Sequence, residues 1–143
     1  MRLKVINKDK IVILILIFVL FIQNICNAPS NVKEKINIKE GDVITVECSA
    51  YTADYESCGK YPDDPNYGIT YSGEYVQEGM IAADTNILPI NTMVYIKGLG
   101  VYVVKDIGEY IVGNRVDIYM EDKNNAIKFG RQQRELIILE MGG

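Results

Sequence analysis

Residues 103–120, VVKDIGEYIVGNRVDIYM, contain the features that decide how this chain folds. An apolar run ends at Asp106, a connection with two glycines follows, and a second run carries Asp117 in its middle. In that second run Val116 and Ile118 alternate with polar residues, which is the period-two pattern of a half-buried strand. Aspartate is disfavoured within strands because its short side chain competes for backbone hydrogen bonds. The position of Asp117 therefore needs an explanation.

Two explanations are open for Asp117. One is a solvated strand face, on which Arg115 forms a surface ion pair with it. The other is a functional site, because Asp106 and Asp84 also follow apolar runs and the three aspartates lie 22 and 11 residues apart. Strand ends that meet in one groove would bring the three carboxyl groups together. The sequence thus predicts a candidate site at Asp84, Asp106 and Asp117.

The start of the chain is typical of an export signal. Met1–Lys10 contains four basic residues, and Ile11–Ile22 is an unbroken run of twelve apolar residues. That run is short for a membrane-spanning helix, which needs about 20 residues. Residues 1–28 are therefore predicted to be a cleaved signal peptide or an uncleaved membrane anchor, and residues 29–41 a linker. Both alternatives place the rest of the chain outside the cytoplasm.

The rest of the chain is acidic and contains no histidine. Residues 1–30 hold four of the 15 basic and one of the 19 acidic residues, so the remainder keeps 11 and 18, a net charge of −7. Because a phosphate backbone would repel such a domain, nucleic-acid binding is not expected. The absence of His excludes Ser-His and Cys-His catalysis and histidine-bound metals, and neither a metal nor a cofactor is expected. Acid–base chemistry near neutral pH then falls chiefly to carboxylates.

The cysteines leave two alternatives open. Cys26 lies in or beside the leader, whereas Cys48 and Cys58 lie close together in the exported part. In such a compartment a disulfide between Cys48 and Cys58 is one alternative, and two free thiols are the other.

Residues 42–143 are predicted to form one mainly β domain. Alternating polar and apolar residues indicate strands, and Gly and Pro mark the turns between them. Asp122–Phe129 is instead helical, with Asp122 as N-cap and Gly130 at the C-terminal cap. The predicted strands are 42–53, 79–83, 92–97, 101–106, 114–120 and 135–140. Many short strands with one short helix favour a small closed barrel.

Several short motifs follow one another along residues 46–139. They are SAY at 49–51, GITYSG at 68–73, AAD at 82–84, ILP at 87–89, VYI at 94–96, KD at 105–106, GNRVDIY at 113–119 and FG at 129–130. In this order they resemble the 3D domain, a family named for three aspartates and related to the barrel domain of membrane-bound lytic murein transglycosylase A. The resemblance implies a six-stranded double-psi β-barrel with one short helix, and cleavage of the glycan strands of peptidoglycan.

The resemblance also implies roles for individual residues. Asp117 matches the catalytic acid/base, and Asp106 and Asp84 match its two companions. The implied reaction is that of a lytic transglycosylase, which cleaves the β-1,4 bond between N-acetylmuramic acid and N-acetylglucosamine and leaves a 1,6-anhydro product. Candidates for binding the sugar are Tyr51, Thr70, Glu109, Arg115 and Tyr119; for the two tyrosines and the threonine a packing role is the alternative.

Residues 107–110, Ile-Gly-Glu-Tyr, depart from the Thr-Gly-Gly-Ala that the family usually has. A carboxylate at Glu109, in place of a glycine, has three readings: it narrows the groove and weakens activity, it points away from the groove, or it binds the sugar itself. Two other functions therefore stay open: a muramidase-type hydrolase that uses two of the aspartates, and a non-catalytic cell-wall-binding module. The expected partner is peptidoglycan, with membrane contact only through the N-terminal segment.

Overall fold

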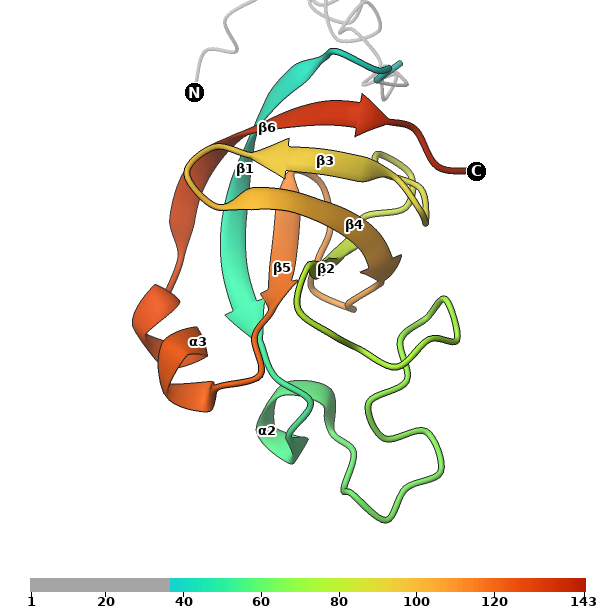
Figure 1. Cartoon of the computed structure of the whole chain (residues 1–143), viewed down its shortest axis with the longest axis vertical. Helices are drawn as coiled ribbons and strands as arrows, with labels where there is room; N and C mark the ends of the chain where they lie inside the picture. The colour runs from blue at the N-terminus through green and yellow to red at the C-terminus, as the bar shows by residue number, and fades with distance from the viewer. Residues whose placement is uncertain (1–36) are drawn as a thin grey trace, which may run out of the picture. The chain divides into compact units, whose positions relative to one another are not determined.

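The computed structural model describes residues 37–143, which fold as a closed barrel of six strands (Figure 1). The predicted leader 1–28, and most of the predicted linker 29–41, lie outside the described residues. Among residues 37–143, no helix has the length and apolarity that a membrane span requires. The elements are β1 (Val43–Tyr51), α2 (Tyr55–Cys58), β2 (Met80–Ala83), β3 (Met93–Ile96), β4 (Gly100–Asp106), β5 (Arg115–Tyr119), α3 (Lys123–Phe129) and β6 (Gln132–Glu140).

The strands follow one another around the barrel in the order β1-β5-β2-β4-β3-β6, and β6 closes it by pairing with β1. The pairs β1/β5 and β2/β4 are parallel, and the other pairs are antiparallel. This interleaved order confirms the predicted six-stranded double-psi barrel. It also places β5 and β4 on either side of β2, although the three strands are separated in the sequence.

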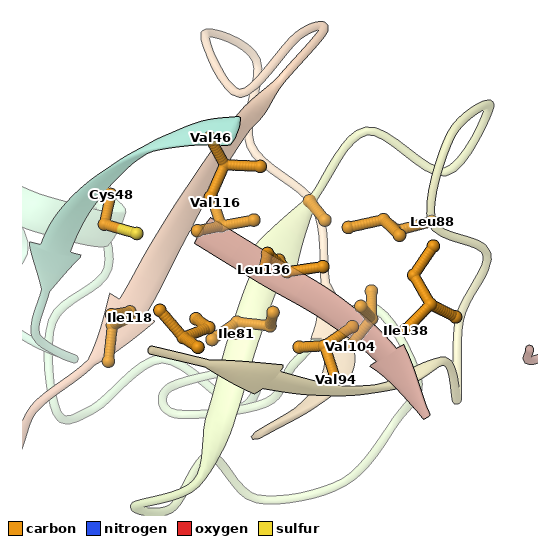
Figure 2. Close-up of a cluster of buried hydrophobic side chains, with 12 residues drawn as sticks. Val46, Cys48, Ile81, Leu88, Val94, Val104, Val116, Ile118, Leu136 and Ile138 are labelled. Atoms are coloured by element: carbon orange, nitrogen blue, oxygen red, sulfur yellow. The ribbon is translucent and has the colours of Figure 1, made fainter. Parts of the chain in front are cut away.

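The apolar positions of the strands form the core. In β5, Val116 and Ile118 are buried and face the interior, while Asp117 between them faces outward. Figure 2 shows how such side chains from the strands and from Leu88 meet in one cluster. The cluster consists of Val46, Cys48, Ile81, Ala83, Leu88, Val94, Ile96, Val104, Val116, Ile118, Leu136 and Ile138. Removal of this apolar surface from water stabilises the barrel.

The helix predicted after β5 is present as α3. The Asp122 carboxylate accepts a hydrogen bond from the Asn125 amide at 2.8 Å, which satisfies one of the free N–H groups of the first turn. Gly130 follows the last turn with φ of 61°, a conformation that glycine adopts without strain. A one-turn helix, α2, was not predicted, because four residues are too few to show a helical period.

The disulfide alternative is wrong, because both cysteines of residues 37–143 carry free thiols. The Cys48 side chain is 0% exposed and belongs to the barrel core. Cys58 ends α2, and its thiol donates to the Ala53 carbonyl at 2.9 Å. Burial raises the pKa of Cys48 to about 11, against the opposing effect of the Arg134 charge. Cys48 therefore stays protonated at neutral pH and acts as an apolar core side chain.

Candidate active site

Four residues from four neighbouring strands lie in one row on the outer face of the barrel wall. In-register pairs join Ser49 to Asp117, Asp117 to Ala82, and Ala82 to Asp106. Residues paired directly across neighbouring strands present their side chains to the same face. The row therefore places the carboxyl groups of Asp106 and Asp117 on either side of the small side chain of Ala82.

A β-bulge in β4 turns Asp106 toward this face. Ile81 pairs with Val104, but the next residue of β2, Ala82, pairs with Asp106, so that Lys105 is the extra residue. Val104 is 0% exposed and faces the core. If the side chains of β4 alternated without interruption, Asp106, two residues after Val104, would face the core as well. The extra residue reverses the direction of Asp106 and brings it into the row.

Asp106 is fixed in place by three hydrogen bonds. Its Oδ1 accepts from the backbone N–H groups of Tyr71 and Ile107, both at 2.9 Å, and its Oδ2 accepts from the Tyr51 hydroxyl at 3.2 Å. Burial, and next the negative charge of Asp106, raise the pKa of Tyr51, so that the hydroxyl keeps its proton and remains a donor. Asp106 is thus a positioned hydrogen-bond acceptor.

Asp117 has a different environment. Its Oδ1 is buried and accepts no hydrogen bond from residues 37–143. Burial raises the pKa of Asp117, while a hydrogen bond with Ser49 and the positive charge of Arg131 oppose the shift. A raised pKa increases the fraction of the carboxyl group that is protonated near neutral pH. Asp117 is therefore the carboxyl group that is better suited to give and take a proton.

Both aspartates line one cavity of about 440 Å³, which we call the aspartate cavity. This volume lies in the range of about 300–1,000 Å³ that is usual for small-molecule sites. Three of the five predicted sugar-binding residues line it, namely Tyr51, Thr70 and Glu109. The Thr70 hydroxyl donates to the Glu74 carbonyl at 3.0 Å, so Thr70 also holds the long connection between α2 and β2, drawn in green in Figure 1.

The turn that follows β4 forms another part of the wall. The Ile111 amide donates to the Gly108 carbonyl at 3.0 Å, and a Cβ atom on Gly108 would lie only 2.7 Å from the Ile111 Cγ1. A residue without a side chain is therefore needed for the turn to close. Glu109 is exposed on this turn and borders the cavity. In the described part of the chain, no three His, Cys, Asp or Glu side chains are grouped closely enough to hold a metal ion.

Asp84, the third predicted aspartate, does not line the aspartate cavity. Its Oδ2 accepts from the Gly113 amide at 2.8 Å, and its Oδ1 accepts from the Asn86 backbone and side-chain amides at 3.0 and 2.9 Å. These bonds tie the end of β2 to the segment that leads into β5. The structure thus brings two of the three aspartates together, and the third positions the loop of residues 107–113.

Arg115 and Tyr119, the other two predicted sugar-binding residues, also lie outside the aspartate cavity. Arg115 forms an ion pair with Glu47 at 2.9 Å and donates to the Tyr110 carbonyl at 3.3 Å, so it braces the loop from outside. Tyr119 packs edge-on against Tyr51, with ring centroids 5.5 Å apart, and lines a neighbouring cavity.

Ser49 was not among the site residues predicted from the sequence. Alternation along residues 43–51 places it on the outer face of β1, but only the parallel pairing of β1 with β5 brings it beside Asp117. That pairing joins segments more than 60 residues apart, and neither segment carries a local signal for it.

Asp84→Ala is expected to lower the free energy of unfolding by about 1–3 kcal/mol, because it leaves the partly buried Gly113 amide without its acceptor. Urea denaturation and hydrogen exchange at Gly113 measure the effect. Asp64→Ala is the matched control, since the Asp64 carboxylate accepts a local bond from the Asn66 amide on an exposed loop. Equal stability of the two variants would contradict a positioning role for Asp84.

Comparison with known proteins finds a family model and several proteins to which part of this chain is similar. Residues 79–140 match the family model of the 3D domain. YabE of Bacillus subtilis (strain 168), whose name refers to cell wall shaping, is 30% identical over 112 residues, which are 76% of this chain and 26% of YabE. YocH of the same strain, named as a cell wall-binding protein, is 31% identical over 91 residues, which are 61% of this chain and 29% of YocH. The chain thus spans less than a third of the length of these relatives.

Among solved structures, the chain is similar to MltA from Escherichia coli, described as a lytic transglycosylase, with a TM-score of 0.45 and 20% identity over 52% of this chain and 28% of MltA. The crystal structure of MltA with bound chitohexaose gives a TM-score of 0.44 and 17% identity, again over 52% of this chain and 28% of MltA. Residues 79–140, which contain Asp84, Asp106 and Asp117, thus match the 3D domain family.

Proposed function

We propose that this domain is a lytic transglycosylase that cleaves the glycan strands of peptidoglycan, with Asp117 as the catalytic acid and base. The observation that carries the proposal is the environment of Asp117: a partly buried carboxyl group with a raised pKa, at the wall of a sugar-sized cavity. The cell-wall names of YabE and YocH support the choice of substrate.

The first step requires a proton donor. The bond between C1 of N-acetylmuramic acid and O4 of N-acetylglucosamine breaks as Asp117 gives its proton to O4, while positive charge builds on C1. An aspartic acid with its ordinary pKa of 3.8 holds almost no proton at neutral pH. Burial raises the pKa of Asp117, which increases the fraction of the protonated form that this step needs.

The second step uses the same group as a base. The ionised Asp117 takes the proton from O6 of the muramic acid, and O6 forms a bond to C1, which closes the 1,6-anhydro ring. Asp117 ends the cycle protonated, as it began, and no water is consumed. One carboxyl group at the scissile bond is therefore sufficient for proton transfer in both steps.

Asp106 has a different role in this scheme. It accepts three hydrogen bonds, so its oxygens are held as acceptors and it is poorly placed to donate a proton. A carboxylate fixed at the same cavity favours the positive charge that develops at C1. The two aspartates thus have different roles because their surroundings differ: Asp117 transfers the proton, and Asp106 stabilises positive charge.

The proposed substrate lies outside the cytoplasmic membrane. The predicted leader of residues 1–28 provides the route of export, and the net negative charge of the remaining chain disfavours nucleic-acid partners. Outside the cytoplasmic membrane, the expected partner of this domain is the glycan strands of peptidoglycan.

A second function, binding to the cell wall without cleavage, is favoured by Glu109. This residue puts a carboxylate at the rim of the aspartate cavity, at a position where the family usually has glycine. Together with the name of YocH as a cell wall-binding protein, it supports a module that holds glycan strands.

Mass spectrometry of the fragments released from purified sacculi distinguishes the alternatives. Products with 1,6-anhydro ends are expected from the transglycosylase, whereas products with reducing ends would indicate a hydrolase that uses two of the carboxyl groups. Retention of the protein on sacculi without any released fragment would favour the binding module.

A further inference from the structure

A second cavity, of about 410 Å³, adjoins the aspartate cavity. We call it the tyrosine cavity, because its wall contains Tyr67, Tyr75 and Tyr119. The two cavities share three wall residues, namely Ala53, Gly68 and Val76. They are therefore neighbouring parts of one depression in the surface.

We propose that the tyrosine cavity binds a further sugar of the glycan strand whose scissile bond lies in the aspartate cavity. This proposal rests on the function proposed above and adds a second contact site to it. Asp117 and Tyr119 are two residues apart on β5, so their side chains point to the same face about 7 Å from each other. A strand of linked sugars that occupies the first cavity can continue along β5 into the second.

The wall of the tyrosine cavity has the chemistry that a sugar requires. The faces of aromatic rings carry negative charge density and attract the C–H groups of a sugar ring. The carboxylates of Asp54 and Glu121 and the ammonium group of Lys123 stand on the same wall and can bond to the hydroxyl and acetamido groups. Asp54 and Lys123 are already paired at 3.2 Å, which holds both groups in place.

Tyr75 is the residue on which the proposal depends most. Its side chain is 75% exposed, so it contributes little to the stability of the fold. Its backbone is nevertheless held by a β-bridge to Ile69, and the next amide, of Val76, donates to the Gly68 carbonyl at 2.7 Å. A large aromatic ring on a fixed backbone offers a stacking surface for which the backbone loses little conformational freedom on binding.

Gly68 forms part of the wall of both cavities. Its φ of +68° favours glycine, and a Cβ atom there would lie 3.8 Å from the Tyr75 ring. Neither Tyr67 nor Tyr75 falls within residues 79–140, which match the 3D domain. The tyrosine cavity is thus built partly from the long connection that precedes the matching residues.

Calorimetric titration of the full chain with N-acetylglucosamine oligomers of two and six sugars tests the proposal. The wild-type protein is expected to bind the hexamer more tightly than the dimer, because the hexamer reaches both cavities. Tyr75→Ala is expected to weaken binding of the hexamer about tenfold and to leave the dimer unchanged. Tyr75→Phe, which keeps the ring, is expected to bind the hexamer as the wild type does.

Tyr95→Ala is the matched control, because Tyr95 is an exposed tyrosine on β3 and lines neither cavity. If Tyr75→Ala binds the hexamer as tightly as the wild type does, the proposed second site is wrong. It is also wrong if the wild type does not bind the hexamer. Release of fragments from sacculi by the wild type is measured separately. If fragments are released while the second site fails, the proposed function stands; if none are released, the transglycosylase proposal itself is wrong.

Discussion

Asp117→Asn is expected to fold and to lose cleavage of peptidoglycan by at least about 100-fold, since general acid–base catalysis typically contributes about 10²–10⁴-fold. Asparagine has nearly the same shape as aspartate but cannot deliver a proton to O4 or accept one from O6. The rate at which soluble fragments leave purified sacculi measures the loss. Asp64→Asn, on an exposed loop, is the control and is expected to cleave as the wild type does. Full activity of Asp117→Asn would remove Asp117 from the mechanism.

The same variant is expected to be more stable than the wild type at neutral pH. Burial raises the pKa of Asp117 in the folded state above its ordinary value of 3.8, so the folded protein binds more protons than the unfolded chain. The free energy of unfolding of the wild type therefore falls as the pH rises from 3.8 through the folded-state pKa. Asparagine has no charge to bury and avoids this loss. Thermal unfolding should show a higher Tm for the variant at neutral pH, and the difference should shrink below pH 3.8.

A difference in Tm that does not change with pH would contradict this explanation, because loss of a titrating group must produce a pH-dependent effect. A lower Tm for the variant at neutral pH would show that the Asp117 carboxylate stabilises the fold.

The second large effect is expected in the core. Ile81→Ala should lower the free energy of unfolding by about 2–5 kcal/mol, because it leaves a cavity among side chains that are fully buried. Ile81 lies on β2 directly before Ala82, and it pairs with Ile118 and Val104 of the two strands that carry the aspartates. The variant is therefore expected to weaken the part of the barrel wall that supports the site.

Urea denaturation of Ile81→Ala and Ile127→Ala measures this effect with the same change of side chain. Ile127 lies on α3 and is 68% exposed, so its replacement is expected to change the stability by no more than about 0.5 kcal/mol. A similar loss in both variants would mean that the barrel interior does not provide the main stabilisation.

The barrel was predictable because its strands are amphipathic. Val116 and Ile118 face the apolar interior of the barrel, and Asp117 between them faces outward, so the residues alternate in polarity along the strand. Most of the other strands show the same alternation. The helix α3 was predictable from the cap residues Asp122 and Gly130. Strand β6 begins at Gln132, three residues before the predicted start, because Gln132 and Gln133 are polar and only their pairing with β1 makes them part of the strand.

The site was only partly predictable, because its geometry depends on pairings between distant segments. The approach of Asp106 to Asp117 requires the bulge at Lys105, and an extra residue in one strand leaves no mark in the sequence of that strand alone. Asp84 is an aspartate at the end of an apolar run, like Asp106, and the sequence therefore predicts it as a site residue. Its carboxylate instead accepts a hydrogen bond from the Gly113 amide and positions the loop of residues 107–113. Ser49 reaches Asp117 through parallel pairing, which no local pattern specifies.

Titration of the Asp117 carboxyl carbon by nuclear magnetic resonance tests the central claim most directly. The claim is that burial at the aspartate cavity makes this carboxyl group keep its proton to a higher pH than an ordinary aspartate does. The Asp117→Asn spectrum identifies the signal, and the chemical shift is followed as the pH is raised. A midpoint above the ordinary value of 3.8 is the predicted result. A midpoint at or below that value would contradict the proposed role of Asp117 as a proton donor.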